Sequence, residues 1–202
     1  MIDHLIIENS IEYTKQRFQQ VSEITKGLCV ITEFLEPSLL HRLLSYCQQE
    51  NLEWTPELNT KGKVDLPSIN TRSKLNFIAD TPIEETHIVI ENLTETLNSL
   101  FLRKNKFNGI TIWKDVKDYQ IGKHTDNPII DFALQVYLTD NIKFGTKFFL
   151  DIGELQLHNK KNLCYLMDNT CNIPHSFDSR ILQNNIKLDN PRYSLYASWS
   201  KE

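Results

Sequence analysis

Apolar residues in the first half of the chain recur with helical spacing in two segments. The first, residues 36–47, has Pro37 near its start and places its apolar residues on one helical face. The second begins at Thr81, which can cap a helix, and continues with Pro82 at the first helical position and Glu84 three residues after the cap. Its apolar stripe consists of Ile83, Ile90, Leu93, Leu97 and Leu100. The pattern predicts two amphipathic helices in this half.

From Gly109 onward the pattern changes to short runs typical of β-strands, separated by turn residues. The predicted strands are 110–113, 132–138, 147–150, 162–167 and 193–199. In the strand 132–138, alternation puts four large apolar side chains on one face and Ala133, Gln135 and Tyr137 on the other. Helices followed by many short strands predict an α+β protein whose strands form a sandwich or barrel.

Composition narrows the class of protein. A chain of 202 residues, 40% hydrophobic and 24% charged, is suited to a single domain with one core. The net charge of -4 and the absence of a long basic run argue against a nucleic-acid partner. The four cysteines form no C-x-x-C pair, and no apolar run has the length of a signal peptide or a membrane span. We therefore expect reduced thiols, a cytoplasmic location and no membrane partner.

A candidate metal site begins with His124 and Asp126. In an extended segment, side chains two residues apart point to the same side, so this imidazole and this carboxylate can bind one ion together. An H-x-D sequence alone is weak evidence, since a lone histidine is more often a structural residue. A third ligand is therefore needed.

His175, in the segment 172–177, is the candidate for that ligand. Two histidines and one carboxylate on one face of a metal leave the opposite positions free for substrates and dioxygen. His175 follows His124 by 51 residues (175 − 124), which leaves room for intervening strands to turn back. The competing His158 lies in a polar run, 156–161, that is typical of a turn.

Arg192 and Ser194 stand at the start of the last predicted strand and share a face by the same period of two. An arginine fork with a hydroxyl beside it suits a carboxylate, here the far end of a dicarboxylate whose other end chelates the metal. In the alternative interpretation Arg192 is a surface residue paired with Asp189, and Ser194 hydrogen-bonds a neighbouring strand.

Together, H-x-D, a distal histidine and R-x-S at the head of a closing strand resemble the Fe(II)/2-oxoglutarate-dependent oxygenase superfamily, particularly its prolyl-4-hydroxylase-like members. The resemblance covers residues 109–201 and implies a double-stranded β-helix, or jelly roll, supported by N-terminal helices. The segment 144–146 resembles the glycine-containing turn found there between the two metal-binding motifs. The resemblance implies that Fe(II) would be bound by His124, Asp126 and His175.

The resemblance also implies the remaining roles. Arg192 and Ser194 would bind 2-oxoglutarate, while Tyr119 lies near the family's usual tyrosine position and would contact the same cosubstrate. The whole chain, 1–202, would form one oxygenase domain, with 1–108 as helical support and substrate loops and 109–202 as the β-rich catalytic core.

The implied reaction is a dioxygenase reaction that uses dioxygen and hydroxylates a C–H bond of a peptide or protein residue or of a small metabolite. Arg72 is a candidate substrate anchor, and Gln135 or Tyr137 could orient the metal ligands. Three alternatives remain: an oxygenase that acts on nucleobases, a non-catalytic jelly-roll binding module, and a zinc hydrolase.

Overall fold

The computed structural model describes residues 4–19, 27–57, 72–116, 119–140, 144–178 and 191–202. Its helices are α1 (His4–Gln19), α2 (Pro37–Cys47), α3 (Pro82–Glu91), α4 (Thr94–Phe101) and the short 3-10 helix η1 (Asn169–Cys171). The strands before the candidate metal ligands are β1 (Leu28–Ile31), β2 (Thr55–Pro56), β3 (Arg72–Leu75) and β4 (Asn105–Asp115). The remaining strands are β5 (Gln120–His124), β6 (Ile130–Tyr137), β7 (Phe144–Leu150), β8 (Gly153–His158), β9 (Cys164–Asp168), β10 (His175–Asp178) and β11 (Arg192–Lys201).

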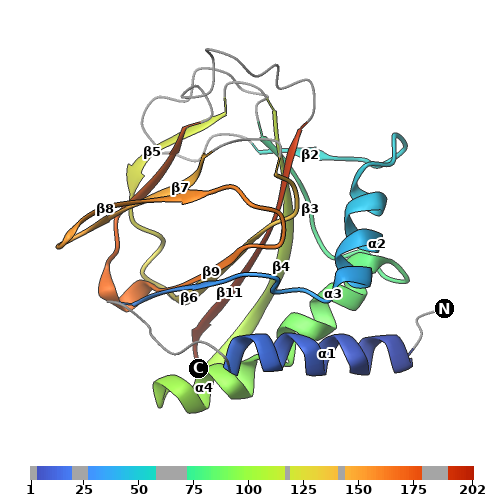
Figure 1. Cartoon of the computed structure of the whole chain (residues 1–202), viewed down its shortest axis with the longest axis horizontal. Helices are drawn as coiled ribbons and strands as arrows, with labels where there is room; N and C mark the ends of the chain where they lie inside the picture. Colours follow the sequence, from blue (N-terminus) through green and yellow to red (C-terminus); the bar gives the residue numbers. More distant parts are fainter. Residues whose placement is uncertain (1–3, 20–26, 58–71, 117–118, 141–143, 179–190) are drawn as a thin grey trace.

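The strands form two antiparallel sheets that face each other (Figure 1). The large sheet has the order β1-β9-β6-β11-β4-β3-β2, and the small sheet has the order β5-β10-β7-β8. Helices α1 to α4 lie along the face of the large sheet that is turned away from the small sheet (Figure 1). This arrangement confirms the predicted α+β class and the jelly roll supported by N-terminal helices.

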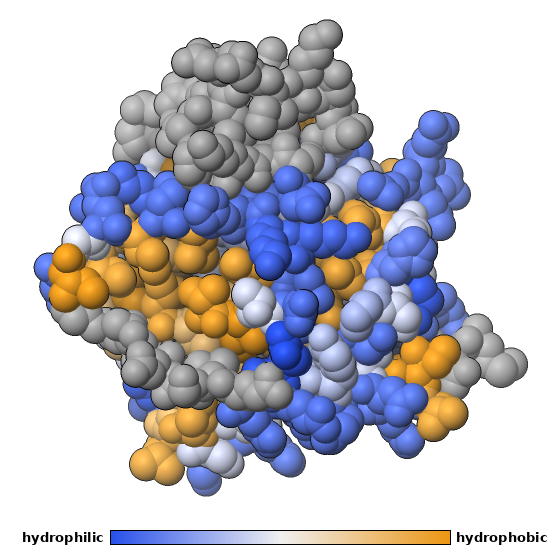
Figure 2. All heavy atoms as spheres, in the orientation of Figure 1, coloured by the Kyte–Doolittle hydropathy of each residue, from blue (hydrophilic) through white to orange (hydrophobic). Residues whose placement is uncertain are grey.

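Strand β6 shows how the sequence builds two separate cores. Phe132, Leu134 and Val136 belong to the core between the large sheet and the helices, as the alternation predicted. Ala133 and Tyr137, on the opposite face of the same strand, belong to the core between the two sheets. Figure 2 shows mostly hydrophilic side chains over α1 and α2, whose buried residues include Ile7 and Phe18 in α1 and Leu39 and Leu43 in α2.

The predicted helix starts are confirmed, but the second helix is two helices. Thr81 caps α3 by accepting a hydrogen bond from the backbone N–H of Ile83, at 3.2 Å. The helix ends at Glu91 because side chains there bond to the local backbone: Asn92 donates to the Ile88 carbonyl at 2.9 Å and Thr94 to that of Glu91 at 2.6 Å. The apolar stripe is consequently shared between α3 and α4.

Several elements were not predicted from the sequence, among them α1, β1, β3, β5 and β10. The segment 144–146 is not a turn: it is the start of β7, and a Cβ atom at Gly145 would overlap the Tyr137 hydroxyl. Glycine is needed there because Tyr137 approaches the strand closely. None of the helices in the described ranges is long and apolar enough to cross a membrane.

Candidate functional site

His124 and His175 face each other across neighbouring strands of the small sheet. His124 is the last residue of β5 and His175 the first of β10, and the antiparallel register pairs these two positions directly. Side chains of paired residues lie on the same face, and the two imidazole ring centres are 4.4 Å apart. Strand pairing therefore brings together two histidines that are 51 residues apart in the chain (175 − 124).

Asp126 completes the group, as the i, i+2 spacing predicted. Its Oδ1 lies 3.8 Å from Nε2 of His124 and 3.6 Å from Nε2 of His175. One donor atom from each of the three residues lies within 4.8 Å of the other two, and all three side chains are largely shielded from solvent. Two imidazoles and a carboxylate at these separations are a donor set that fits a divalent transition metal such as Fe(II).

Backbone carbonyls orient both imidazole rings. Nδ1 of His124 lies 2.8 Å from the carbonyl oxygen of Gly122, and Nδ1 of His175 lies 3.2 Å from that of Ile173. These contacts assign the proton to Nδ1 in each ring, which leaves the Nε2 lone pair pointing toward Asp126 and available to a metal.

Gln135 and Tyr137, which the sequence suggested as orienting residues, have a different role. The Tyr165 hydroxyl donates to the Gln135 side-chain oxygen at 2.6 Å, and the Tyr137 hydroxyl donates to Oγ1 of Thr146 at 3.0 Å. Oγ1 of Thr146 in turn donates to the Tyr165 hydroxyl at 3.2 Å. The four side chains form a polar network in the inner core.

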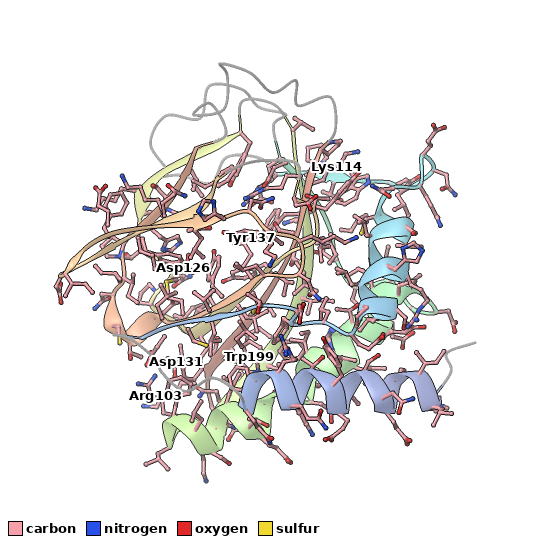
Figure 3. All side chains as sticks on the ribbon, in the orientation of Figure 1. Arg103, Lys114, Asp126, Asp131, Tyr137 and Trp199 are labelled. Carbon is pink, nitrogen blue, oxygen red and sulfur yellow. The ribbon has the colours of Figure 1, made fainter. Side chains whose placement is uncertain are left out.

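A cavity of about 370 Å³ between the two sheets connects the candidate metal site with a group of arginines. Its lining includes His124, Asp126 and His175 on the small-sheet side, and Arg72 and Arg192 on the large-sheet side. Figure 3 shows Asp126 and Tyr137 in the space between the sheets, whereas Trp199 lies on the helix side. Below, the side of the cavity lined by His124, Asp126 and His175 is called the metal wall. The side lined by Arg72 and Arg192 is called the arginine wall.

Arg192 is buried in the arginine wall and is not a surface residue. Its guanidinium lies 3.8 Å from the ring centre of Phe177, and its Nε and Nη2 donate to Oδ2 of Asp115, the former at 3.0 Å. Nη1 is buried and has no hydrogen-bond partner within the described part of the chain. The acidic partner is therefore Asp115; Asp189, the alternative considered above, lies outside the described residues.

Ser194 is fully buried on the same face of β11 as Arg192. Its Oγ has no hydrogen-bond partner among the described residues, so the proposed hydrogen bond to a neighbouring strand is absent there. Ser194 does not line the cavity itself. The two orphaned polar atoms, Nη1 of Arg192 and Oγ of Ser194, fit a ligand that brings acceptor oxygens to this wall.

Arg72 and Tyr119 also lie in the cavity. Tyr119 is buried, its ring stacks on Phe177 with centres 5.8 Å apart, and burial raises its pKa to about 12. The Arg72 guanidinium lies between two rings, 4.0 Å from the centre of Tyr119 and 4.5 Å from that of Trp113. Both residues therefore stand beside the candidate cosubstrate space, while His158, at the end of β8, is not part of the metal cluster.

Asp115 is the residue that sequence reasoning missed. It accepts hydrogen bonds from Arg72 and Arg192, and it is 3% exposed. Burial alone would raise the pKa of its carboxyl, but the charges of the two arginines outweigh burial and hold the pKa below its ordinary value of 3.8. The only sequence signal was an acidic residue two positions after the predicted strand 110–113, and acidic residues are common near strand ends.

Neither a family model nor a curated protein matches the sequence. Solved structures do match the fold. A prolyl-4-hydroxylase from Pseudomonas putida superimposes with a TM-score of 0.66 and 13% identity, over 95% of this chain and 98% of that one. A prolyl hydroxylase from Trichoplax adhaerens, solved with a peptide of hypoxia inducible factor, gives 0.64 and 14%, over 100% and 94%.

The α-ketoglutarate-dependent epimerase SnoN from nogalamycin biosynthesis is also similar, with a TM-score of 0.59 and 11% identity over 98% of this chain and 82% of that one. The similar structures thus include enzymes with different reactions on one scaffold. At these identities the likeness concerns the fold, and it confirms the resemblance at that level. This chain has the jelly-roll fold of the prolyl-4-hydroxylases and other 2-oxoglutarate/Fe(II) oxygenases.

Proposed function

We propose that the protein is an Fe(II)- and 2-oxoglutarate-dependent dioxygenase that hydroxylates a C–H bond of a peptide or protein residue or of a small metabolite. The observation that carries this proposal is the group of His124, Asp126 and His175, whose donor atoms lie within 4.8 Å of one another inside a jelly-roll cavity. The fold, shared with known oxygenases, supports the same class.

In this proposal the metal wall binds iron through Nε2 of both histidines and a carboxylate oxygen of Asp126. When bound, iron with 2-oxoglutarate and dioxygen would supply the oxidising chemistry: the cosubstrate is converted to succinate and carbon dioxide, and one oxygen atom enters the substrate. The protein's part is to fix the two ring orientations through the carbonyls of Gly122 and Ile173, so that the ligands meet the metal without rearrangement.

The arginine wall binds the distal carboxylate of 2-oxoglutarate. Arg192 offers the buried Nη1, and Ser194 offers a buried hydroxyl close by on the same strand face. A carboxylate there would satisfy polar atoms that have no hydrogen-bond partner in the described part of the chain, and a charged hydrogen bond of this kind is stronger than a neutral one. Tyr119, beside Arg72 and Phe177, would form the side of this pocket.

The proposal names one type of reaction but includes two types of substrate, a peptide or protein residue and a small metabolite. The Trichoplax enzyme was solved with a peptide, which supports a peptide substrate here, and the cavity is large enough for a small side chain beside a bound cosubstrate. The net charge of -4 gives no support to a nucleobase substrate, because proteins that bind nucleic acid usually carry a basic surface.

The test is metal-dependent turnover of 2-oxoglutarate. Purified protein supplied with Fe(II), ascorbate and dioxygen is expected to release succinate slowly without substrate, and faster with a suitable peptide or metabolite. The variant His124→Ala should abolish this release, because it removes one of the three metal ligands.

The matched control is His158→Ala, a histidine that is exposed and outside the metal cluster. It should release succinate at the wild-type rate. A wild-type protein that binds Fe(II) but neither binds nor consumes 2-oxoglutarate would favour the non-catalytic binding module. Zinc-dependent hydrolysis without 2-oxoglutarate would favour a hydrolase.

A further inference from the structure

Asp115 lies between two arginines that come from distant parts of the chain. Arg72 donates from Nε to Oδ1 at 2.6 Å and from Nη2 to Oδ2 at 3.0 Å. Arg192 donates to Oδ2 from the other side. The register of the large sheet produces this arrangement, because Asp115 of β4 pairs with Arg72 of β3 on one side and with Arg192 of β11 on the other.

The three side chains carry a net charge of one positive unit. Asp115 and Arg192 are each 3% exposed, and the Arg72 side chain is 17% exposed. Among the described residues, the other carboxylates nearby are Asp126, in the metal wall, and Glu57, which forms an ion pair with Lys74 at 3.0 Å. An uncompensated buried charge is costly, so this wall favours an anionic ligand.

Stacking fixes Arg72 in its place. Its guanidinium lies between Trp113 and Tyr119, Tyr119 stacks on Phe177, and Phe177 in turn lies against Arg192. The two cations and three rings thus form one continuous stack beside Asp115. Arg72 cannot leave Asp115 without giving up two cation-π contacts.

Removal of Arg72 would change what Arg192 can do. Asp115 and Arg192 alone would be a neutral pair, and the attraction of this wall for a carboxylate would be weak. With Arg72 present, Asp115 is already neutralised by a second cation. The charge of Arg192 therefore remains effective at Nη1, which has no hydrogen-bond partner among the described residues.

We propose that Arg72 is a positioning residue for the cosubstrate: by neutralising Asp115, it keeps Arg192 available to the distal carboxylate of 2-oxoglutarate. This inference rests on the proposed function. Charge counting agrees with it. A divalent metal with Asp126 gives +1, the arginine wall gives +1, and a dianionic 2-oxoglutarate brings the cavity to neutrality. The cavity would then have no net positive charge left to bind an acidic group of the primary substrate.

The test measures 2-oxoglutarate binding under anaerobic conditions by titration calorimetry, with Mn(II) in place of iron. Arg72→Gln is expected to weaken binding roughly 10- to 100-fold, as loss of a supporting residue around a bound group typically does. Arg72→Lys, which keeps the charge but not the fork, should weaken it much less.

The decisive variant is the double substitution Arg72→Gln with Asp115→Asn. It removes the carboxylate that would otherwise neutralise Arg192, so affinity for 2-oxoglutarate should return to within about threefold of the wild type, a small difference on the affinity scale. If Arg72 instead contacts the ligand directly, the double variant will bind as weakly as Arg72→Gln, and the inference is overturned.

Lys74→Gln is the matched control. Lys74 is two residues from Arg72 on β3 and lies 5.9 Å from the Trp113 ring centre, but it does not line the cavity. Its loss should change the affinity less than roughly twofold, because Lys74 is half-buried, lies outside the cavity and has its charge paired with Glu57. Mn(II) affinity and the far-UV circular dichroism spectrum should be the same in all variants, which separates an effect on binding from misfolding.

The outcomes distinguish this inference from the proposed function. A wild type that binds 2-oxoglutarate, with Arg72→Gln binding equally well, leaves the function standing and overturns the inference. A wild type that binds Mn(II) but no 2-oxoglutarate overturns the proposed function and this inference with it.

Discussion

The metal wall and the arginine wall of the cavity are built in different ways. In the metal wall, His124 and His175 stand at the ends of two short, paired strands of the small sheet, and Asp126 follows His124 by two residues. The arginine wall joins Arg72, Asp115 and Arg192 by hydrogen bonds within the large sheet, and Asp115 and Arg192 are each 3% exposed.

The difference separates function from stability. Among the described residues, the ion pairs of Asp126 are with the two histidines alone, so we expect the fold to depend little on it. Asp115 is the counter-charge of two buried guanidiniums. We therefore expect the metal wall to contribute mainly to the site. The arginine wall should contribute to the stability of the fold as well as to the site.

Substitution of the two aspartates should give the largest contrast. Asp115→Ala leaves two buried positive charges without a partner and is expected to lower the free energy of unfolding by about 3–5 kcal/mol. Asp126→Ala should change it by less than about 1 kcal/mol in the absence of metal, while lowering metal affinity at least roughly 100-fold. Urea unfolding followed by circular dichroism, together with Mn(II) titration, measures both. Equal stability of the two variants would contradict the contrast.

Two residues of the metal wall could be singled out in the sequence because their signal is local, and their role as metal ligands stays a prediction. His124 and Asp126 form a two-residue motif, and the apolar alternation of the strand 132–138 correctly indicated which face turns toward the helices. The R-x-S segment is likewise a local pattern, and its role in cosubstrate binding also stays a prediction. The fold class followed from the change of apolar periodicity near Gly109. Such a change can be recognised from residues that are close together in the sequence.

The arginine wall could not be predicted in full because its pairing is set by strand register. Arg72, Asp115 and Arg192 meet through the order β3-β4-β11, and β3 follows a polar region that has no strand pattern in the sequence. β5 and β10 were missed because each is short and contains polar site residues in place of an apolar alternation. Their pairing, which sets the separation of the two histidines, is a tertiary property.

Acid should weaken the arginine wall through Asp115. The two arginines lower the pKa of this carboxyl in the folded protein below its ordinary value of 3.8. A lowered folded-state pKa adds stability that is present above the unfolded-state pKa and is lost as the pH falls through the folded-state value. Unfolding free energy should therefore decline from about pH 4 downward, an estimate set by the ordinary pKa of aspartate.

The double variant Arg72→Gln with Asp115→Asn provides the comparison for this effect. It has no carboxyl at position 115, so its unfolding free energy should fall less steeply below pH 4 than that of the wild type, by linkage to one proton fewer. Urea unfolding between pH 3 and pH 6 measures both slopes. Parallel slopes would mean that other carboxyls dominate the acid response and that the arginine wall is not its main source.

Thr146 provides the smallest and most specific test, because it lines the cavity and its hydroxyl belongs to the polar network of the inner core. Its Oγ1 accepts a hydrogen bond from Tyr137 at 3.0 Å and donates one to Tyr165 at 3.2 Å. Thr146→Val keeps the shape but leaves the Tyr137 hydroxyl without its acceptor, which should cost about 1–2 kcal/mol. Thr125→Val, at a position that lines the cavity and has no such network, should stay within about 0.5 kcal/mol of the wild type.

Mn(II) and 2-oxoglutarate affinities should remain unchanged in both variants if each wall holds its ligand independently of the network. A loss of 2-oxoglutarate affinity in Thr146→Val alone would instead mean that Tyr137, whose ring centre lies 6.0 Å from the Arg192 guanidinium, helps to position the arginine wall.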